Sequence, residues 1–94
     1  YALPSANRHA RWNLHEFIPT KTDIAFAKQF IDWNALPYGL ERIDACRLAD
    51  GSMLLMEVES EMPMLCLDVL SDKTRERVLQ TLLESMQRAF NVSP

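Results

Sequence analysis

Residues 42–63, RIDACRLADGSMLLMEVESEMP, decide the fold of this chain. Two runs rich in apolar residues, 41–48 and 52–60, are joined through Asp50 and Gly51. An Asp-Gly pair favours a tight two-residue hairpin turn because both residues tolerate a positive φ angle. The stretch therefore predicts a β-hairpin.

A four-residue loop over 49–52 determines which side chains of this hairpin share a face. In that register Asp44 lies directly opposite Glu57, and Arg42 lies opposite Glu59. All four side chains then point to one face, together with four less polar neighbours: Cys46, Leu48, Met53 and Leu55. The other face is mostly apolar and is expected to cover the core: Ile43, Ala45, Leu54, Met56 and Val58. A three-residue loop would shift the register and move one carboxylate to the apolar face.

The N-terminal third predicts a strand followed by a helix. Residues 1–8 lack periodicity and are expected to form a flexible leading segment. Loose alternation of apolar and polar residues predicts a strand over 9–18, whose polar side chains fit a solvated face or a ligand-facing one: His9, Arg11 and His15. Thr20 followed by Asp23 resembles a capping box, so a helix is expected over 21–33.

A second helix is predicted from Ser71, whose side chain suits an N-cap position. Its apolar residues recur at helical spacing, so we expect one face to pack on something large: Val78, Leu79, Leu82, Leu83, Met86 and Phe90. The element order becomes strand, helix, strand, strand, helix. This order predicts an α+β fold, a small antiparallel sheet with helices packed on one face, as a single domain over 9–94.

Composition narrows the class of function. The chain has 94 residues, 48% of them hydrophobic, and a net charge of −3, which argues against nucleic-acid or anionic-membrane binding. Cys46 and Cys66 lack metal-site spacing and are expected to be reduced core residues. With no signal sequence before residue 9, a cytoplasmic location is expected. Because the chain begins at Tyr1 rather than Met, it is expected to be a piece of a longer protein.

The predicted pairing of Asp44 with Glu57 is the most informative feature. Like charges directly opposite on a sheet are destabilising unless a cation, a proton or an arginine offsets them. Asp44, Glu57 and Glu59 supply oxygen ligands of the kind that Mg²⁺ or Mn²⁺ takes, and Arg42 beside them suits a phosphate. The alternative is a solvated polar face in which Arg42 and Glu59 form an ordinary cross-strand ion pair.

The hairpin resembles the C-terminal metal-binding hairpin of the ATP-grasp superfamily, which includes the D-alanine:D-alanine ligases and glutathione synthetases. The matching positions are Arg42, Asp44, the Asp50-Gly51 turn, Glu57, Glu59 and Pro63. Glu59 stands where many members have Asn, and Met64 stands where a Gly commonly follows the proline. The close similarity covers about residues 40–67.

The resemblance implies an ATP-dependent carboxylate–amine ligase that works through an acyl phosphate. Asp44, Glu57 and Glu59 then fall on Mg²⁺-ligating positions, and Arg42 falls on an arginine that contacts the transferred phosphate. In that family the nucleotide-contacting lysines and the glycine-rich loop lie N-terminal to this hairpin, and no glycine-rich loop occurs in these 94 residues. The chain is thus expected to be the last part of such an enzyme, inactive alone, with ATP and a small carboxylic acid as ligands of the full-length protein.

One other class of function stays open. A small interaction or chaperone-like module that forms a homodimer also suits a short chain with five Met residues. Such a module has no use for paired carboxylates, whereas a metal site needs them. A cysteine hydrolase is disfavoured, because the only possible bases for the cysteines, His9 and His15, lie in a different segment and no local nucleophile motif is present. A glycosidase is disfavoured because the chain is too short to build a deep cleft.

Overall fold

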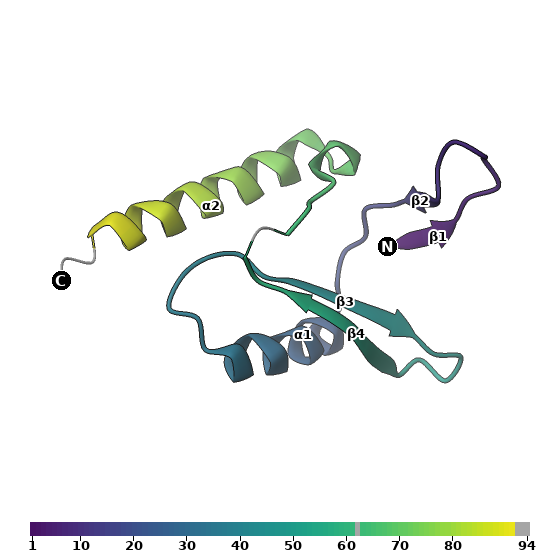
Figure 1. Cartoon of the computed structure of the whole chain (residues 1–94), viewed down its shortest axis with the longest axis horizontal. Coiled ribbons are helices and arrows are strands. Elements are labelled where there is room, and N and C mark those ends of the chain that lie inside the picture. The colour runs from purple at the N-terminus through teal and green to yellow at the C-terminus, as the bar shows by residue number, and fades with distance from the viewer. Residues whose placement is uncertain (62, 92–94) are drawn as a thin grey trace.

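In a computed structural model, which describes residues 1–61 and 63–91, the chain has an α+β fold, as the sequence predicts. Met62 and residues 92–94, part of the expected 9–94 domain, lie outside the described residues. Figure 1 gives the element order: strand β1 (Ala2–Pro4), strand β2 (Trp12–Leu14), helix α1 (Lys21–Asn34), strand β3 (Arg42–Arg47), strand β4 (Met53–Glu59), the 3₁₀ helix η1 (Leu67–Val69) and helix α2 (Asp72–Asn91).

The strands form two separate antiparallel pairs instead of one small sheet. β1 pairs with β2, and β3 pairs with β4. The predicted leading segment 1–8 thus contains a strand, and the strand predicted over 9–18 is only three residues long. The rings of Tyr1 and His15 stack 4.9 Å apart across this pair. Such cross-strand contacts leave no periodic signal in so short a segment.

Helix α1 begins at the predicted capping box. The main-chain N–H of Asp23 donates to Thr20 Oγ1 (3.2 Å), and the N–H of Thr20 donates to Asp23 Oδ2 (2.9 Å). The helix ends at Ala35, whose φ of 52° is left-handed and whose N–H donates to the carbonyl of Ile31. Two unpaired helix-end groups are therefore satisfied at the start and one at the end.

The turn of the β3–β4 hairpin differs from the prediction. The N–H of Leu48 donates to the carbonyl of Ser52 (2.8 Å), and the N–H of Gly51 donates to the carbonyl of Leu48 (2.9 Å). Gly51 is the loop residue with a positive φ, 87°. The loop is therefore a three-residue turn with a left-handed glycine, and neither the two-residue turn nor the four-residue loop is present.

A β-bulge at Met56 compensates for the shorter loop. Ala45 pairs with Leu55, yet Asp44 pairs with Glu57, so Met56 is an extra residue in β4. The three-residue loop shifts the register by one position, and the bulge shifts it back. The predicted pairing of Asp44 with Glu57 is thereby confirmed, although the shorter loop and the bulge that produce it were not predicted.

The bulge also corrects the predicted faces between the turn and Met56. Leu55 pairs with Ala45 and therefore shares its face, which is the face toward α1. Met53, opposite Arg47, lies on that face too. Leu54 instead lies on the carboxylate side and is 54% exposed. The prediction had these three residues on the wrong faces because it placed no extra residue in the strand.

Helix α2 starts as predicted but packs on little of the described chain. Ser71 caps it, accepting the N–H of Thr74 at Oγ (3.3 Å). Arg75 then ties the first turn to carbonyls just before the helix, at Leu67 (3.1 Å) and Leu70 (3.0 Å). Figure 1 shows α1 along the β3–β4 hairpin and α2 well separated from both. Both helices were predicted to pack on one face of the sheet, but only α1 packs on the β3–β4 hairpin.

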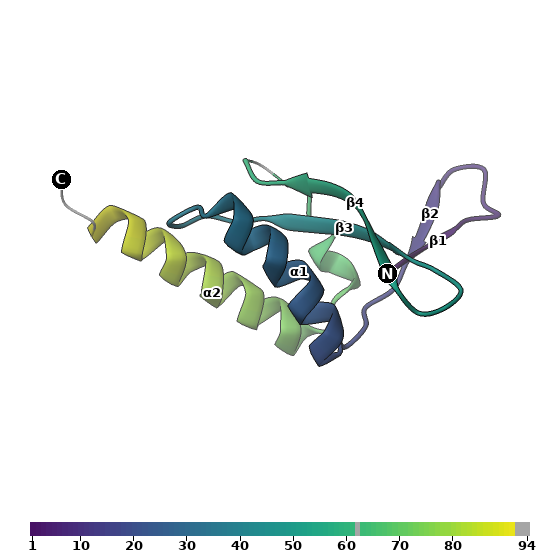
Figure 2. The same ribbon diagram turned by 90° about the horizontal axis from the view of Figure 1, so that it is seen from below.

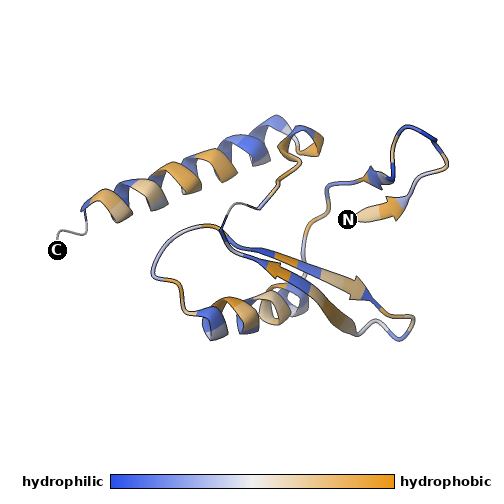
Figure 3. Ribbon diagram, viewed as in Figure 1, coloured by the Kyte–Doolittle hydropathy of each residue, from blue (hydrophilic) through white to orange (hydrophobic). Residues whose placement is uncertain are grey.

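Within residues 1–61 and 63–91 no apolar side chain is buried, and Asp23 is the one buried residue. Figure 2 shows the same elements from below, with the β1–β2 pair apart from the two helices, and Figure 3 shows apolar residues along α2 as well as along the hairpin. Cys46 and Cys66 are free, yet both are exposed, which corrects their predicted burial. No helix of the described part is long and apolar enough to cross a membrane.

Candidate functional site

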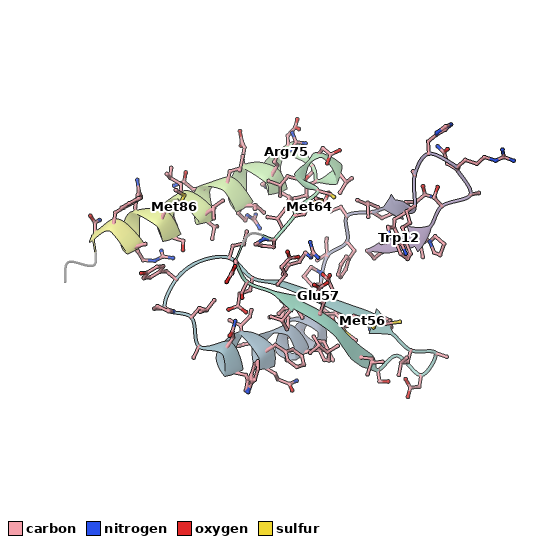
Figure 4. All side chains as sticks on the ribbon, in the orientation of Figure 1. Trp12, Met56, Glu57, Met64, Arg75 and Met86 are labelled. Carbon is pink, nitrogen blue, oxygen red and sulfur yellow. The ribbon has the colours of Figure 1, made fainter. Side chains whose placement is uncertain are left out.

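The candidate site is the face of the β3–β4 hairpin that turns away from α1. Strand alternation and the bulge bring Arg42, Asp44, Glu57 and Glu59 onto this face, called here the carboxylate face. Arg42 lies opposite Glu59, and Asp44 lies opposite Glu57. All four residues that the sequence predicted for the site are therefore together. Figure 4 labels Glu57 on the hairpin and Met64 on the segment that leads from β4 to α2.

The guanidinium of Arg42 is the centre of the carboxylate face. Its Nε and Nη2 donate to Oδ1 and Oδ2 of Asp44, both at 2.9 Å, which is a two-pronged ion pair. Nη2 also lies 3.0 Å from Oε2 of Glu59. Nη1 donates to the main-chain carbonyl of Met64 at 2.7 Å. The hydrogen bonds to Asp44, with the nearby Glu59 and Glu57 charges adding to them, raise the pKa of Arg42.

Glu57 is held least firmly of the three carboxylates. Its Oε2 lies 3.9 Å from Nη2 of Arg42, which is beyond hydrogen-bond distance. Its side chain is 59% exposed, against 36% for Asp44 and 39% for Glu59. Three carboxylates and one guanidinium leave a net charge of −2 on the face at neutral pH. Arg42 therefore offsets only part of the repulsion between Asp44 and Glu57.

The donor chemistry of the carboxylate face fits a hard divalent cation. The three acidic side chains offer only oxygen ligands, and their net charge of −2 together with Arg42 matches the charge of Mg²⁺ or Mn²⁺. In the described residues no three Asp, Glu, His or Cys side chains already surround one point. The three carboxylates instead surround the guanidinium of Arg42, which is the positive charge among them.

A second ion pair joins the hairpin to α1 and was not predicted. Arg47 Nη2 donates to Oδ1 of Asp23 at 2.7 Å, next to the Thr20 capping box. The main-chain N–H of Thr20, and then Arg47, lower the pKa of Asp23. The sequence identified Asp23 as a cap residue. It gave no sign of Arg47 as its partner, because the pairing depends on how α1 lies against β3.

The polar residues of the N-terminal strand pair interact within that pair. His15 stacks on Tyr1, and the guanidinium of Arg11 lies 5.8 Å from the ring of Trp12. For His9 the structure gives one main-chain contact, its N–H donating to Asn7 Oδ1 at 3.0 Å. No hydrogen bond or ion pair of the described chain joins His9, Arg11 or His15 to the carboxylate face.

Known proteins add no further constraint on this site. Comparisons of the chain with protein-family models, with curated proteins and with solved structures found no match. The arrangement of Arg42, Asp44, Glu57 and Glu59 on one hairpin face is therefore the basis on which a function is assigned.

Proposed function

We propose that this chain supplies the Mg²⁺ and phosphate side of the active site of an ATP-dependent carboxylate–amine ligase of the ATP-grasp type. The single observation that supports the proposal is the pairing of Asp44 with Glu57, with Arg42 and Glu59 beside them on one face. Without a ligand this arrangement costs stability, because like charges lie directly opposite on the sheet. A role in binding a cation explains why the chain has two like charges in a position where they reduce its stability.

Each residue of the carboxylate face then has a physical task. Asp44, Glu57 and Glu59 hold the metal ion through their oxygens, and Glu57 is the most accessible of them. The bound ion offsets negative charge as a phosphoryl group is transferred. Arg42 presents N–H groups in a planar fork that suits a phosphate as well as it suits Asp44. The chain acts here as one wall of the site, and ATP and the acid substrate also contact the rest of the full-length enzyme.

Mn²⁺ binding to the isolated chain tests the proposal directly. We expect electron paramagnetic resonance to detect a bound Mn²⁺ whose affinity falls at least tenfold in Glu57→Gln and in Asp44→Asn. Glu76→Gln on α2 is the matched control, because it removes one carboxylate from an exposed helical position outside the hairpin. This control should bind Mn²⁺ as the wild-type chain does.

The same titration shows how the proposal fails. If all four proteins bind Mn²⁺ with equal affinity, the ion associates with acidic residues in general and not with the carboxylate face. If the wild-type chain binds none at millimolar Mn²⁺, the face is an ordinary polar surface in which Arg42 forms ion pairs.

A further inference from the structure

Protein acceptors already occupy both edges of the Arg42 guanidinium. A guanidinium presents two parallel N–H groups on either of two edges, one made by Nε with one Nη and the other made by the two Nη atoms. On the first edge, Nε and Nη2 donate to the two oxygens of Asp44, both at 2.9 Å. On the second edge, Nη1 donates to the carbonyl of Met64 at 2.7 Å, and Nη2 lies 3.0 Å from Oε2 of Glu59. A phosphate that takes two N–H groups of Arg42 must therefore replace one of these acceptors.

Asp44 is the main competitor of a phosphate for Arg42. Its two oxygens take the paired N–H groups in the same fork geometry that a phosphate uses, and two-pronged charged contacts are the strong ones. The net charge of −2 on the carboxylate face also repels an anion. In this arrangement Asp44 therefore keeps the Nε–Nη2 edge of Arg42 closed to a phosphate.

The same carboxylate is one of the three proposed metal ligands. When Asp44 ligates a divalent cation, it shares its negative charge with an ion of twice the charge of a guanidinium, so its attraction for Arg42 falls. The cation and the guanidinium also repel each other. An anion that contacts both positive charges removes this repulsion. Metal ligation by Asp44 thus makes the Nε–Nη2 edge of Arg42 available and favours an anion there.

We infer that Asp44 holds Arg42 closed to phosphate until Asp44 ligates a divalent cation, and that Arg42 then donates its Nε–Nη2 edge to a phosphate group. The contact of Nη1 with the neutral carbonyl of Met64 keeps the guanidinium at the carboxylate face. Because coupling between two sites is reciprocal, metal and phosphate strengthen each other's binding. The inference rests on the proposed function, which makes Asp44 a metal ligand.

NMR spectra of the ¹⁵N-labelled chain test the inference through the side-chain Nε–H signal of Arg42. Saturating Mg²⁺ alone should shift this signal, because the hydrogen bond to Asp44 is lost. The Nε–H signal of Arg47 is the internal control and should stay in place, because Arg47 pairs with Asp23 outside the carboxylate face. Inorganic phosphate, followed by the Arg42 signal, should bind at least tenfold tighter with Mg²⁺ than without it.

A matched pair of variants separates the contact from the charge. Asp44→Asn and Glu57→Gln each remove one negative charge from the carboxylate face. Only Asp44→Asn breaks the two-pronged contact, since Glu57 lies 3.9 Å from Nη2 of Arg42. Without Mg²⁺, Asp44→Asn should therefore bind inorganic phosphate at least threefold tighter than Glu57→Gln. If circular dichroism shows that Asp44→Asn has lost its strands, the Mg²⁺ titration of the wild-type chain decides.

The outcomes distinguish this inference from the proposed function. An Arg42 Nε–H signal that does not move while electron paramagnetic resonance shows a filled Mn²⁺ site would overturn the inference and leave the metal site in place. Equal phosphate affinity with and without Mg²⁺, or equal metal-free affinity in the two folded variants, would overturn it in the same way. A chain that binds no Mn²⁺ would overturn both.

Discussion

The carboxylate of Asp23 joins the start of α1 to strand β3. Its Oδ2 accepts the N–H of Thr20 at the start of α1, and its Oδ1 accepts a hydrogen bond from Arg47 on β3. It is 7% exposed, and the side chain of Arg47 is 53% exposed, so the pair lies at the border of the α1–hairpin layer. The capping box and the ion pair therefore place α1 on the hairpin at one point.

Stability should depend on the ionisation of Asp23. Its pKa is lowered by the N–H of Thr20 and by Arg47, so its stabilising effect is present above the ordinary carboxyl pKa of about 3.9 and is lost as pH falls through the lowered value. Asp23→Asn should be less stable than wild type at pH 7, and the difference should shrink below pH 4. Urea denaturation at a series of pH values measures this. A constant difference from pH 7 to pH 2 would contradict the assignment.

The contacts of Arg42 show which side-chain partners can be predicted from the alternation of residues along a strand. The sequence places Arg42, Asp44 and Glu59 on one face, and the structure confirms this. The cross-strand ion pair with Glu59, expected in the alternative interpretation, is present at 3.0 Å. The two-pronged contact with Asp44, two residues along the same strand, was not predicted. The Met64 carbonyl was also unforeseen, because its position depends on the chain path after β4.

At the scale of elements, Gly51 allows the turn of the β3–β4 hairpin to form. The loop closes on Gly51 with φ 87°, and Asp50 Oδ1 accepts the N–H of Ser52 at 2.9 Å. The hydroxyl of Ser52, followed by its N–H, lowers the pKa of Asp50. The Asp-Gly pair was the correct signal for a hairpin. It could not distinguish loop lengths, because a left-handed glycine serves several turn types.

Substitutions at Gly51 should separate backbone conformation from side-chain contacts. No atom lies within 4 Å of a Cβ built at Gly51, so Gly51→Ala costs stability through its φ angle alone. We expect a loss of about 1 kcal/mol in the free energy of unfolding. Gly51→Asn should lose less, because Asn tolerates the left-handed region. Urea denaturation of the two variants checks the order, and equal losses would contradict it.

Helices were predicted more fully than strand pairings. Thr20 and Ser71 mark their starts by local chemistry, and both caps are present. The pairing of β1 with β2 and the bulge at Met56 depend on contacts between separate segments, which local patterns do not encode. The apolar stripe of α2 was also recognised, but a periodic stripe does not identify the surface that covers it.

At the scale of the whole molecule, the chain exposes more surface than a compact domain of its size. Its accessible area is 8151 Å², whereas a folded monomer of its mass exposes about 5,500 Å². Its radius of gyration is 15.3 Å, against about 12 Å for a compact domain of this length. The excess of accessible area is similar to the area that one partner buries in the largest obligate interfaces, about 2,500 Å². The chain is therefore more open than a compact domain of its length.

Unfolding of the chain by itself should therefore be weakly cooperative. Little apolar area is removed from water, so the dependence of the unfolding free energy on urea should be below about 1 kcal/mol per M, the low end for small domains. Circular dichroism reports the helices, and the fluorescence of Trp12 and Trp33 reports the N-terminal half. The two transitions should not coincide. A single steep transition seen by both methods would contradict this description.

The bulge at Met56 bears on how related sequences can be recognised. A strand without Met56, joined by the same three-residue loop, would still place Glu57 opposite Asp44. Two sequences that differ by one residue between these carboxylates can thus build the same face. A search pattern with one fixed spacing would find one of them and miss the other, and a pattern that allows both lengths follows from the geometry of the strand.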